Sequence, residues 1–381
     1  MNPIRQFVAR IVERFPHSVA LATVAALCLV AYANSLPNPF QFDDIQGIIR
    51  NPTIRDLDRI PSYFTDIATS ALATGRDWRP ILQTTYALNY AMGGLNPIGY
   101  RISNLLFHIG TSWLIFLVVG EIFRLGRISI TPPWSPTAKP VGRNPELEPP
   151  AKAGARVEGS TTTPALIAAL LFAIHPVNSE AVNYIWARSS VLMAFFYLLA
   201  FYCFLRGPWS EQPQSRNWHM AGLVSFILSI GTKAPGVTLP AILVLYEVIF
   251  RNPNSENPLK LFWKEPRRLV KYLPITLLCL AYIGFRFVYL SGFFRRVGSA
   301  TSQVTGTTYL LTQCRAWIYY IRLFLWPDPL ITDYPGFGWS YSFWDAGVPL
   351  SFGIIITILL LAWLMRNSQP VLTLFILWFF V

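Results

Sequence analysis

Two adjacent carboxylates, Asp43 and Asp44, follow the first apolar run in the segment PNPFQFDD. Adjacent side chains on an extended or turning chain point in different directions, so at most one of the pair faces a given substrate. A carboxylate at a membrane edge is partly desolvated, which raises its pKa and suits it to general-base catalysis. For an isolated acidic pair, an Asx-type turn or a helix cap is the simpler interpretation. The pair by itself leaves both open.

Four further polar residues lie inside or beside apolar runs. His175 and Glu180 flank a break in LFAIHPVNSEAV, at a depth where ionisable groups are costly and often functional. They either serve a site or hold a helical hairpin together, and the residues favour neither interpretation. Asn104 and His108 are spaced i, i+4 and share one helix face. For these two, a hydrogen bond that packs the bundle is the simpler interpretation.

Five basic residues stand where they could meet an anionic group. A guanidinium binds phosphate through its planar fork, and a lysine in a helix break can meet a charged head group. Cations near membrane ends also snorkel to the interface, which is the simpler interpretation for each one alone. The five residues are Arg79, Arg101, Arg188, Lys233 and Arg286.

The composition indicates that membrane-embedded elements position these residues. The chain is 53% hydrophobic and 13% charged, whereas soluble domains carry about 25% charged residues. The net charge of +12 is typical of cytoplasmic loops that collect Lys and Arg, so we exclude nucleic acid as a partner. All four cysteines lie in apolar runs without a CxxC pair, which argues against a metal site and a disulfide framework.

Apolar runs recur along the chain, several of them close to the roughly 20 residues that a membrane helix needs. We therefore predict an all-α, polytopic membrane bundle of about 9–11 helices. The runs cover 17–36, 101–123, 164–177, 184–205, 218–232, 236–250, 272–292, 309–326, 343–365 and 370 onward.

The basic residues of the short loops set the expected orientation, because such loops stay in the cytoplasm. The basic segments are 1–16, 206–217 and 251–271. Residues 37–100 then lie outside. The N-terminus resembles a cleaved signal, but we interpret it as a retained signal anchor with a cytoplasmic N-terminus. Segment 327–342 is acidic and lacks Lys and Arg, against strict alternation, and one resolution is that 309–326 does not cross.

The predicted spans divide the chain into six parts. In the first outer loop, which we expect to be folded, residues 81–92 predict an amphipathic helix. The basic, proline-rich composition of the insertion indicates a disordered or extended cytoplasmic segment. The last apolar run stops at Val381, so we expect more protein downstream. The parts are a cytoplasmic N-terminus (1–16), the first membrane helix (17–36), the first outer loop (37–100), a second helix (101–123), the insertion (124–163) and the remaining membrane helices (164–381).

Several motifs taken together resemble one family. PFQFDDIQGIIRNPTI, WRPILQTTYALNYAMGGLNPIGYRISNLLFH and ALLFAIHPVNSEAVNYIWARSSVL have the order and spacing of the transmembrane-and-tetratricopeptide-repeat O-mannosyltransferases and their bacterial relatives. GTKAPG and LFLWPDPLITDY are weaker matches. Each piece alone is weak, but the combination across 36–200 is fairly specific.

This resemblance implies a GT-C membrane domain that uses a sugar on a polyisoprenyl phosphate. The acceptor is a hydroxyl of a protein or glycan, transfer inverts the sugar, and the site faces outward. Asp43 matches the first acid of the family motif and would be the general base, with Asp44 in support. The five cations would stabilise the phosphate leaving group, and Asn104, His108, His175 and Glu180 would support the site. Bacterial relatives imply the inner membrane.

Two departures from the family pattern keep other functions open. Ala234 follows Lys233, where family members usually carry an acid, and no tetratricopeptide repeats follow the membrane segments. One alternative is a non-catalytic membrane subunit that retains the fold in a complex with other membrane subunits. Another is a transporter or flippase, which is disfavoured because the sequence has no inverted repeat. The sugar and the acceptor stay open, as does a requirement for a divalent cation, and we assign no metal-ligating residue.

Overall fold

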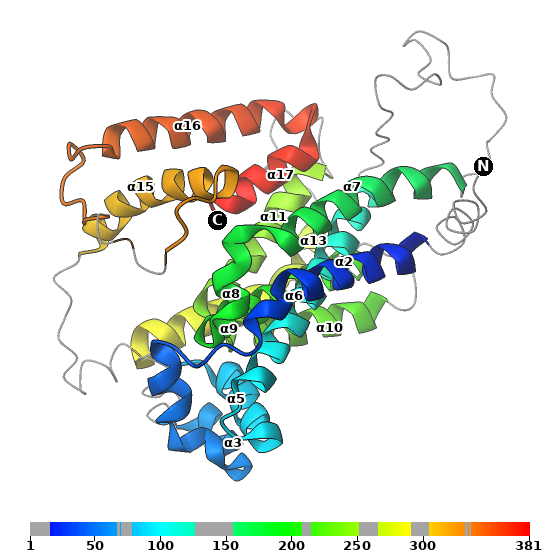
Figure 1. Cartoon of the computed structure of the whole chain (residues 1–381). Helices are drawn as coiled ribbons and strands as arrows, with labels where there is room; N and C mark the ends of the chain where they lie inside the picture. Colours follow the sequence, from blue (N-terminus) through cyan, green and yellow to red (C-terminus); the bar gives the residue numbers. More distant parts are fainter. Residues whose placement is uncertain are drawn as a thin grey trace, which may run out of the picture.

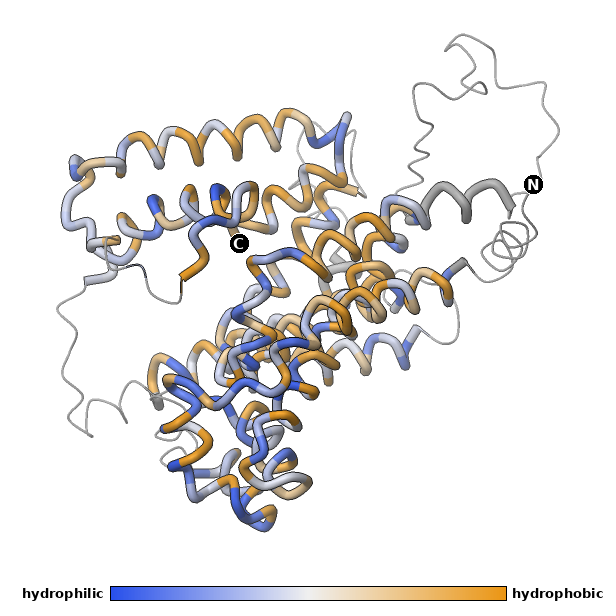
Figure 2. The backbone as a smooth tube through the Cα atoms, viewed as in Figure 1, coloured by the Kyte–Doolittle hydropathy of each residue, from blue (hydrophilic) through white to orange (hydrophobic). Residues whose placement is uncertain are grey.

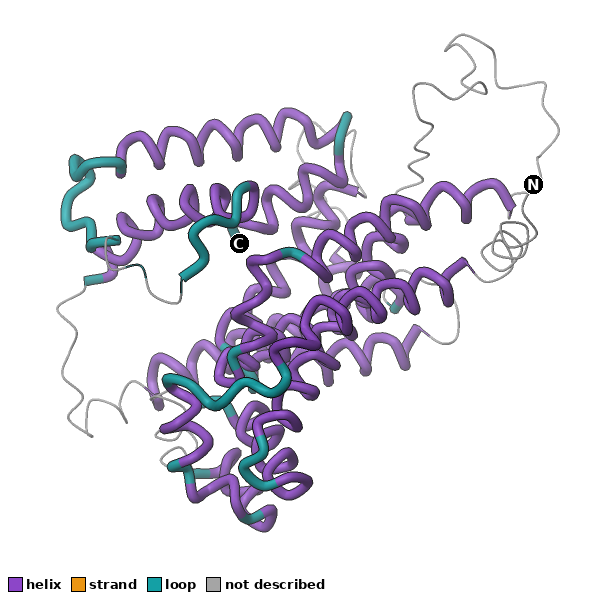
Figure 3. Tube along the Cα trace, viewed as in Figure 1, coloured by secondary structure: helices purple, strands orange, loops and turns teal. Residues whose placement is uncertain are grey.

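All regular secondary structure in the described part of the chain is helical (Figure 1, Figure 3). The computed structural model describes residues 16–66, 69, 78–125, 155–207, 215–250, 266–290, 305–331, 334 and 337–381. The α-helices are α2 (Pro16–Tyr32), α3 (Ile60–Thr65), α5 (Pro80–Gly93), α6 (Pro97–Leu125), α7 (Ala155–Ile174), α8 (Ser179–Asn183), α9 (Arg188–Arg206), α10 (Ser215–Ile230), α11 (Leu239–Phe250), α13 (Pro266–Gly284), α15 (Gly306–Leu325), α16 (Val348–Leu364) and α17 (Pro370–Phe379). Short 3-10 or π turns are η1 (Ala33–Ser35), η2 (Ile45–Ile49), η3 (Pro52–Arg55), η4 (Leu57–Arg59), η6 (Pro176–Asn178), η7 (Ile185–Ala187), η8 (Ala234–Thr238), η9 (Phe285–Leu290) and η10 (Met365–Asn367).

Among the described residues, five helical stretches are long and apolar enough to cross a membrane. They are His17–Ser35, Pro97–Arg124, Ile185–Arg206, Val270–Val288 and Val348–Asn367. A bent pair, Thr162–Ile174 with Pro176–Asn183, makes a sixth if it is one span. These helices confirm the predicted all-α, polytopic membrane bundle. Helix α15, which covers the apolar run of ambiguous topology, does not pass this test of length and composition.

The bend between α7 and α8 begins at His175-Pro176. Proline disfavours helical backbone at the residue before it, and His175 is extended with ψ 126°. The His175 Nδ1 atom then accepts a hydrogen bond from the Val177 backbone N–H at 3.2 Å, which caps the next turn. The two halves of the pair meet at 50°. The bend therefore brings the polar HPVNSE segment to one end of the bundle.

Two apolar cores hold the bundle together. One is built mainly from α9, α10, α11 and α13 and includes Leu374 of α17, and the other from α2, α6 and α7. In Figure 1, α15, α16 and α17 form a layer set beside the bundle. Figure 2 shows apolar residues along these helices and polar residues gathered around the first outer loop and the α7–α8 bend. The polar chemistry is therefore concentrated at one end of the molecule.

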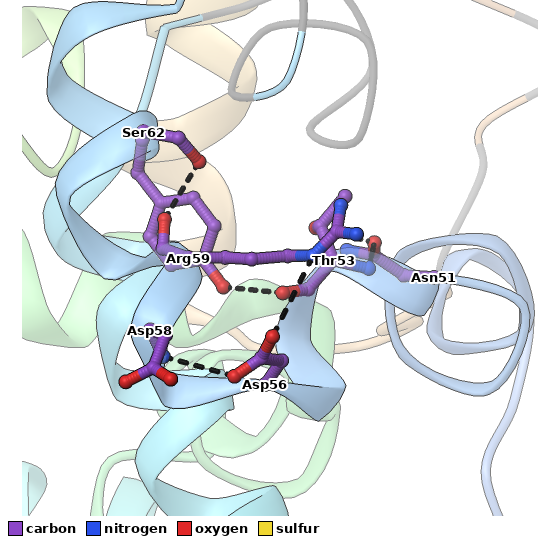
Figure 4. Close-up of polar contacts among 7 residues, drawn as sticks. Asn51, Thr53, Asp56, Asp58, Arg59 and Ser62 are labelled. Carbon is purple, nitrogen blue, oxygen red and sulfur yellow. Dashed lines mark hydrogen bonds and ion pairs between the residues drawn. The ribbon is translucent and has the colours of Figure 1, made fainter.

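The first outer loop has a core of its own, as expected for a folded loop. The buried residues of the loop are Ile48, Ile54, Tyr63, Leu82, Tyr86, Ala87 and Tyr100, and Ile185 of η7 completes the cluster. Most of the polar side chains labelled in Figure 4 form hydrogen bonds to backbone groups of the same turn. Asn51 Oδ1 accepts from the Thr53 N–H at 3.0 Å, Asp56 Oδ1 accepts from the Asp58 N–H at 3.0 Å, and the Ser62 hydroxyl donates to the Arg59 carbonyl at 2.6 Å. These groups act as caps and leave the acidic pair as the chemically distinct feature of the loop.

Two predicted boundaries need correction. Helix α7 already starts at Ala155, so the end of the insertion 124–163 is helical and not extended. Helix α6 starts at Pro97, because proline suits the first turn of a helix, so Arg101 lies inside the helix. The rest of the insertion, 126–154, and the basic segments 1–15 and 251–265 lie outside the described residues.

Candidate active site

A cavity of about 530 Å³ opens where four parts of the chain meet, and α6 contributes Arg101 to it. The first outer loop forms one wall, the α7–α8 bend a second, and α15 with the segment after it a third. Of the residues singled out from the sequence, Asp44, Arg101 and Glu180 line it. The lining comprises Asn38, Gln41, Phe42, Asp44, Arg101, Val177, Ser179, Glu180, Asn183, Tyr184, Tyr320, Leu323, Leu330, Ile331 and Tyr334.

Asp43 lies beside this cavity, with its side chain exposed to solvent. Its backbone N–H donates to the Tyr184 hydroxyl oxygen at 3.0 Å. Burial raises the pKa of Tyr184 to about 12, and the charges of the two acids add to this effect. Tyr184 therefore stays protonated and can donate a hydrogen bond to Asp43 at neutral pH.

Asp44 has the opposite environment, because its side chain is completely buried. Its Oδ2 atom accepts from the Gln41 backbone N–H at 3.0 Å and its Oδ1 atom from the Trp186 backbone N–H at 2.8 Å. Burial raises the pKa of Asp44, although these hydrogen bonds and the nearby Arg101 act to lower it. The two neighbouring acids thus differ in role: Asp44 ties the loop to η7, while Asp43 faces solvent.

A close approach of two segments fixes the loop behind the acids. Gly47 has no side chain, and the Trp186 ring occupies the space where one would begin: a Cβ added at Gly47 would lie 1.7 Å from that ring. Trp186 is also stacked on Tyr86 of α5, with ring centroids 6.0 Å apart. The glycine is therefore required for η2 to lie against η7 and α5.

Arg101 lines the cavity, but its guanidinium is largely used by the protein. Nε donates to the Asn183 carbonyl at 3.0 Å, and Nη2 donates to the Pro39 carbonyl at 2.7 Å. Nη1 donates to the carbonyls of Leu36 and Asn38. An arginine has five N–H groups, so these four bonds leave one of them. Arg101 therefore mainly holds the irregular segment 36–39 against α6 and α8.

Arg188 is fully buried and does not line the cavity. Nε donates to Asn104 Oδ1 at 2.7 Å and Nη2 to the Tyr100 carbonyl at 2.8 Å. Nη1 donates to the Thr85 hydroxyl at 3.2 Å, and the guanidinium lies over the Tyr86 ring at 4.7 Å. This arginine joins α5, α6 and α9 at the base of the site.

The other polar residues of the membrane helices also join elements. Asn104 Nδ2 donates to the Val182 and Tyr184 carbonyls at 3.2 and 3.3 Å. His108 Nε2 lies 2.9 Å from the Ala173 carbonyl of α7. These bonds fix α6 against the α7–α8 segment, directly beneath the cavity wall.

His175 connects the α7–α8 bend to α15. Because its Nδ1 atom accepts from a backbone N–H, the ring proton is on Nε2, which donates to the Phe324 carbonyl at 2.9 Å. The two rings are stacked with centroids 4.9 Å apart. Glu180 is exposed and lines the same cavity wall. His175 therefore holds α15 in place as the third wall.

Arg79, Lys233 and Arg286 are not among the residues that line the cavity. The Ile81 N–H donates to the Gly231 carbonyl at 3.2 Å, which places the start of α5 beside the break before η8. Lys233 Nζ donates to the Ser190 hydroxyl at 2.8 Å, and the Trp78 ring meets Phe285 with centroids 5.1 Å apart. The five predicted phosphate-binding residues therefore do not form one cluster. Arg101 lines the cavity, whereas Arg79, Lys233 and Arg286 do not.

A second, apolar cavity of about 670 Å³ adjoins the first. Val177 lines both cavities. The stacked pair of His175 and Phe324 lines the second cavity, next to Val177. Its other walls come from α6, α7, α9 and α17. A polar cavity and an apolar one thus meet at the bend, an arrangement suited to a ligand with a polar head and an apolar tail.

Sequence reasoning missed the third wall of the polar cavity. Tyr320, Leu330 and Tyr334 carry no motif of their own, and the only signal was the weak match LFLWPDPLITDY. It also missed Tyr184, which the motif NYIW contains. In the part of the chain that the structure describes, no three His, Cys, Asp or Glu side chains come together as metal ligands.

Fold and site together define an integral membrane protein of the all-α, polytopic class, with a polar cavity at one end of the bundle. Residues 152–295 match the family model of the dolichyl-phosphate-mannose-protein mannosyltransferases. Human protein O-mannosyl-transferase TMTC3 is 26% identical over 234 residues, 60% of this chain and 21% of that protein. Human TMTC4 is 27% identical over 239 residues, 60% of this chain and 29% of that protein.

Protein O-mannosyl-transferase tmtc2 of Xenopus laevis matches a longer stretch, with 24% identity over 326 residues, 81% of this chain and 34% of that protein. The chain is therefore a homologue of the protein O-mannosyl-transferases, which confirms the resemblance seen in its motifs. It spans between a fifth and about a third of the length of these relatives. No solved structure matches the chain.

Proposed function

We propose that the chain is the membrane domain of a glycosyltransferase that moves a sugar from a polyisoprenyl phosphate to an acceptor hydroxyl with inversion. The names of its relatives support transfer of mannose to protein. The observation that carries the proposal is an exposed carboxylate, Asp43, at the edge of a polar cavity that adjoins an apolar one. The polar cavity would take the sugar and phosphate, and the apolar cavity the polyisoprenyl chain.

The proposed reaction uses Asp43 as the general base. The acceptor oxygen forms a bond to C1 of the sugar while its proton passes to the Asp43 carboxylate. The bond between C1 and the phosphate oxygen breaks, and the polyprenyl phosphate leaves with the electron pair. The Tyr184 hydroxyl, which accepts a hydrogen bond from the Asp43 backbone N–H, would hold the backbone at the base in place. Asp44 supports the base by holding the loop to η7.

The leaving phosphate needs positive charge near it. Arg101 is the cation in the cavity lining and has one N–H group left for this purpose. Arg188 lies beneath the cavity, where its charge contributes without contact. For Arg79, Lys233 and Arg286 we propose binding of an anionic lipid head group beside α5. The site would face the outer side of a bacterial inner membrane, with the N-terminus in the cytoplasm.

The test is Asp43→Asn, with transfer of mannose from a polyprenyl-phosphate donor measured in membranes and glycans on cell-surface proteins read in parallel. We expect the rate to fall by about 10²- to 10⁴-fold, the usual contribution of a general base. Asp58→Asn is the matched control, because Asp58 is exposed in the same loop and away from the cavity. An Asp43→Asn protein at normal level and full activity would favour the alternative, a non-catalytic membrane subunit.

A further inference from the structure

Phe42, directly before the acidic pair, has two unfavourable features at once. Its backbone φ is +45°, the left-handed region that large side chains rarely adopt. Its ring is 64% exposed, although it is a large apolar group. Among the described residues it is the only non-glycine with a positive φ. Such strain persists only where the surrounding structure enforces it, and it occurs often at functional sites.

The surrounding turn shows what enforces the strain. The Asp44 N–H donates to the Gln41 carbonyl at 2.9 Å, and the Gln41 N–H donates to Asp44 Oδ2 at 3.0 Å. Phe42 is the second residue of this turn, a position with positive φ that glycine, asparagine or aspartate normally occupies. Glycine would satisfy the backbone without strain. The turn therefore explains the conformation, but it does not explain why a phenylalanine is there.

The place of the ring supplies the explanation. Phe42 lines the polar cavity, and its ring is perpendicular to the Tyr184 ring, with centroids 6.2 Å apart. The Tyr184 hydroxyl in turn accepts a hydrogen bond from the Asp43 backbone N–H. An aromatic ring that only anchors the loop in the membrane interface would need neither a strained backbone nor a position on the cavity wall beside the base.

We propose that the Phe42 ring is the platform on which the sugar of the donor stacks, which makes it a specificity-determining residue. This inference rests on the proposed transferase function. The apolar C–H face of a hexose suits a flat aromatic ring, while the sugar's hydroxyls can reach the neighbouring acid. The face of an aromatic ring is electrostatically negative, so the ring disfavours phosphate there. The turn then sets the sugar and Asp43 side by side.

The experiment measures binding of two lipids to the purified full chain in nanodiscs: a polyprenyl-phosphate mannose and the same polyprenyl phosphate without sugar. We expect Phe42→Gly to weaken binding of the mannose lipid by about tenfold and to leave binding of the bare lipid within about twofold. Phe42→Trp should bind both lipids like the wild type, and Phe42→Leu should behave like Phe42→Gly. Phe42→Gly should not lower the thermal midpoint, because glycine accepts a φ of +45°.

Each other outcome identifies what has failed. If Phe42→Gly binds both lipids as the wild type does, the stacking role is wrong and the proposed function stands. If it loses both lipids equally, the ring anchors the lipid or the loop, and the stacking role is again wrong. If the wild type binds neither lipid and transfers no mannose, the proposed function itself fails and takes this inference with it.

Discussion

Arg188 illustrates how a buried charge can serve a membrane protein without touching a ligand. Its guanidinium is 0% exposed and donates to a side-chain amide, a backbone carbonyl and a hydroxyl from two helices. Two tyrosine rings, those of Tyr86 and Tyr100, lie against it. A buried cation is costly unless it is hydrogen-bonded, and here each of the three guanidinium nitrogens donates to a separate partner. Arg188 is thus a junction that fixes α5 and α6 against α9.

We predict that Arg188→Met destabilises the protein by about 3 kcal/mol or more, because each buried acceptor left without a donor costs about 1–3 kcal/mol. The measurement is the unfolding free energy in mixed micelles by denaturant titration. Arg50→Met is the matched control, since Arg50 is an exposed arginine of the outer loop, and it should change stability by less than about 0.5 kcal/mol. Equal stability of the two variants would show that the Arg188 network contributes nothing net.

At the scale of elements, the site depends on how α15 is held. α15 contributes Tyr320 and Leu323 to the polar cavity and Phe324 to the apolar one. In Figure 1 it belongs to the layer beside the bundle. The stacked pair of His175 and Phe324, with its 2.9 Å hydrogen bond, ties this layer to the α7–α8 bend. A local contact at the bend therefore helps to hold α15 where it lines both cavities.

We predict that His175→Ala loosens α15 while the bundle stays folded. The variant loses the bond to the Phe324 carbonyl, the ring stack and the cap of η6, which together are worth about 1–3 kcal/mol. Hydrogen exchange should rise over Gly306–Leu325 and stay unchanged over Pro97–Leu125. His219→Ala is the control, because His219 lies on α10 with its ring against Phe204. Unchanged exchange in α15 would mean that other contacts hold the third wall.

At the scale of the whole molecule, two cavities adjoin each other, and under the proposed function they would take the head and the tail of a lipid donor. The polar cavity combines residues from four parts of the chain, and the apolar one extends from the same bend along α6, α7 and α17. The two cavities share Val177 of the α7–α8 bend. This separation predicts that chain length and head group of a donor are recognised independently.

We predict that Ala168→Trp, which fills the apolar cavity from α7, raises the KM for a long-chain polyprenyl-phosphate mannose by about tenfold or more. A donor with a short chain should be affected by less than about threefold, because its tail does not extend along the cavity. Ile167→Trp is the matched control, since Ile167 is exposed on the same helix and does not line the cavity. Equal effects on both donors would show that the tail lies elsewhere.

Local patterns in the sequence were enough to predict most helices of this protein. Each predicted apolar run overlaps a helix in the part of the chain that the structure describes, because hydrophobicity and proline breaks act over a few residues and need no distant partner. The amphipathic helix expected over 81–92 is α5, for the same reason. The acidic pair, the HPVNSE bend and Arg101 could also be assigned to one neighbourhood, because the family motifs specify them together.

The role of each polar residue, in contrast, depends on contacts between distant segments. The partners of Arg188 are Asn104, Thr85 and Tyr100, between 84 and 103 positions away, and the partner of His175 lies 149 positions away. Local patterns cannot specify such contacts, since they depend on how the helices pack. The same packing buries Asp44 and exposes Asp43. Two residues that look alike in sequence therefore differ in burial and in chemistry.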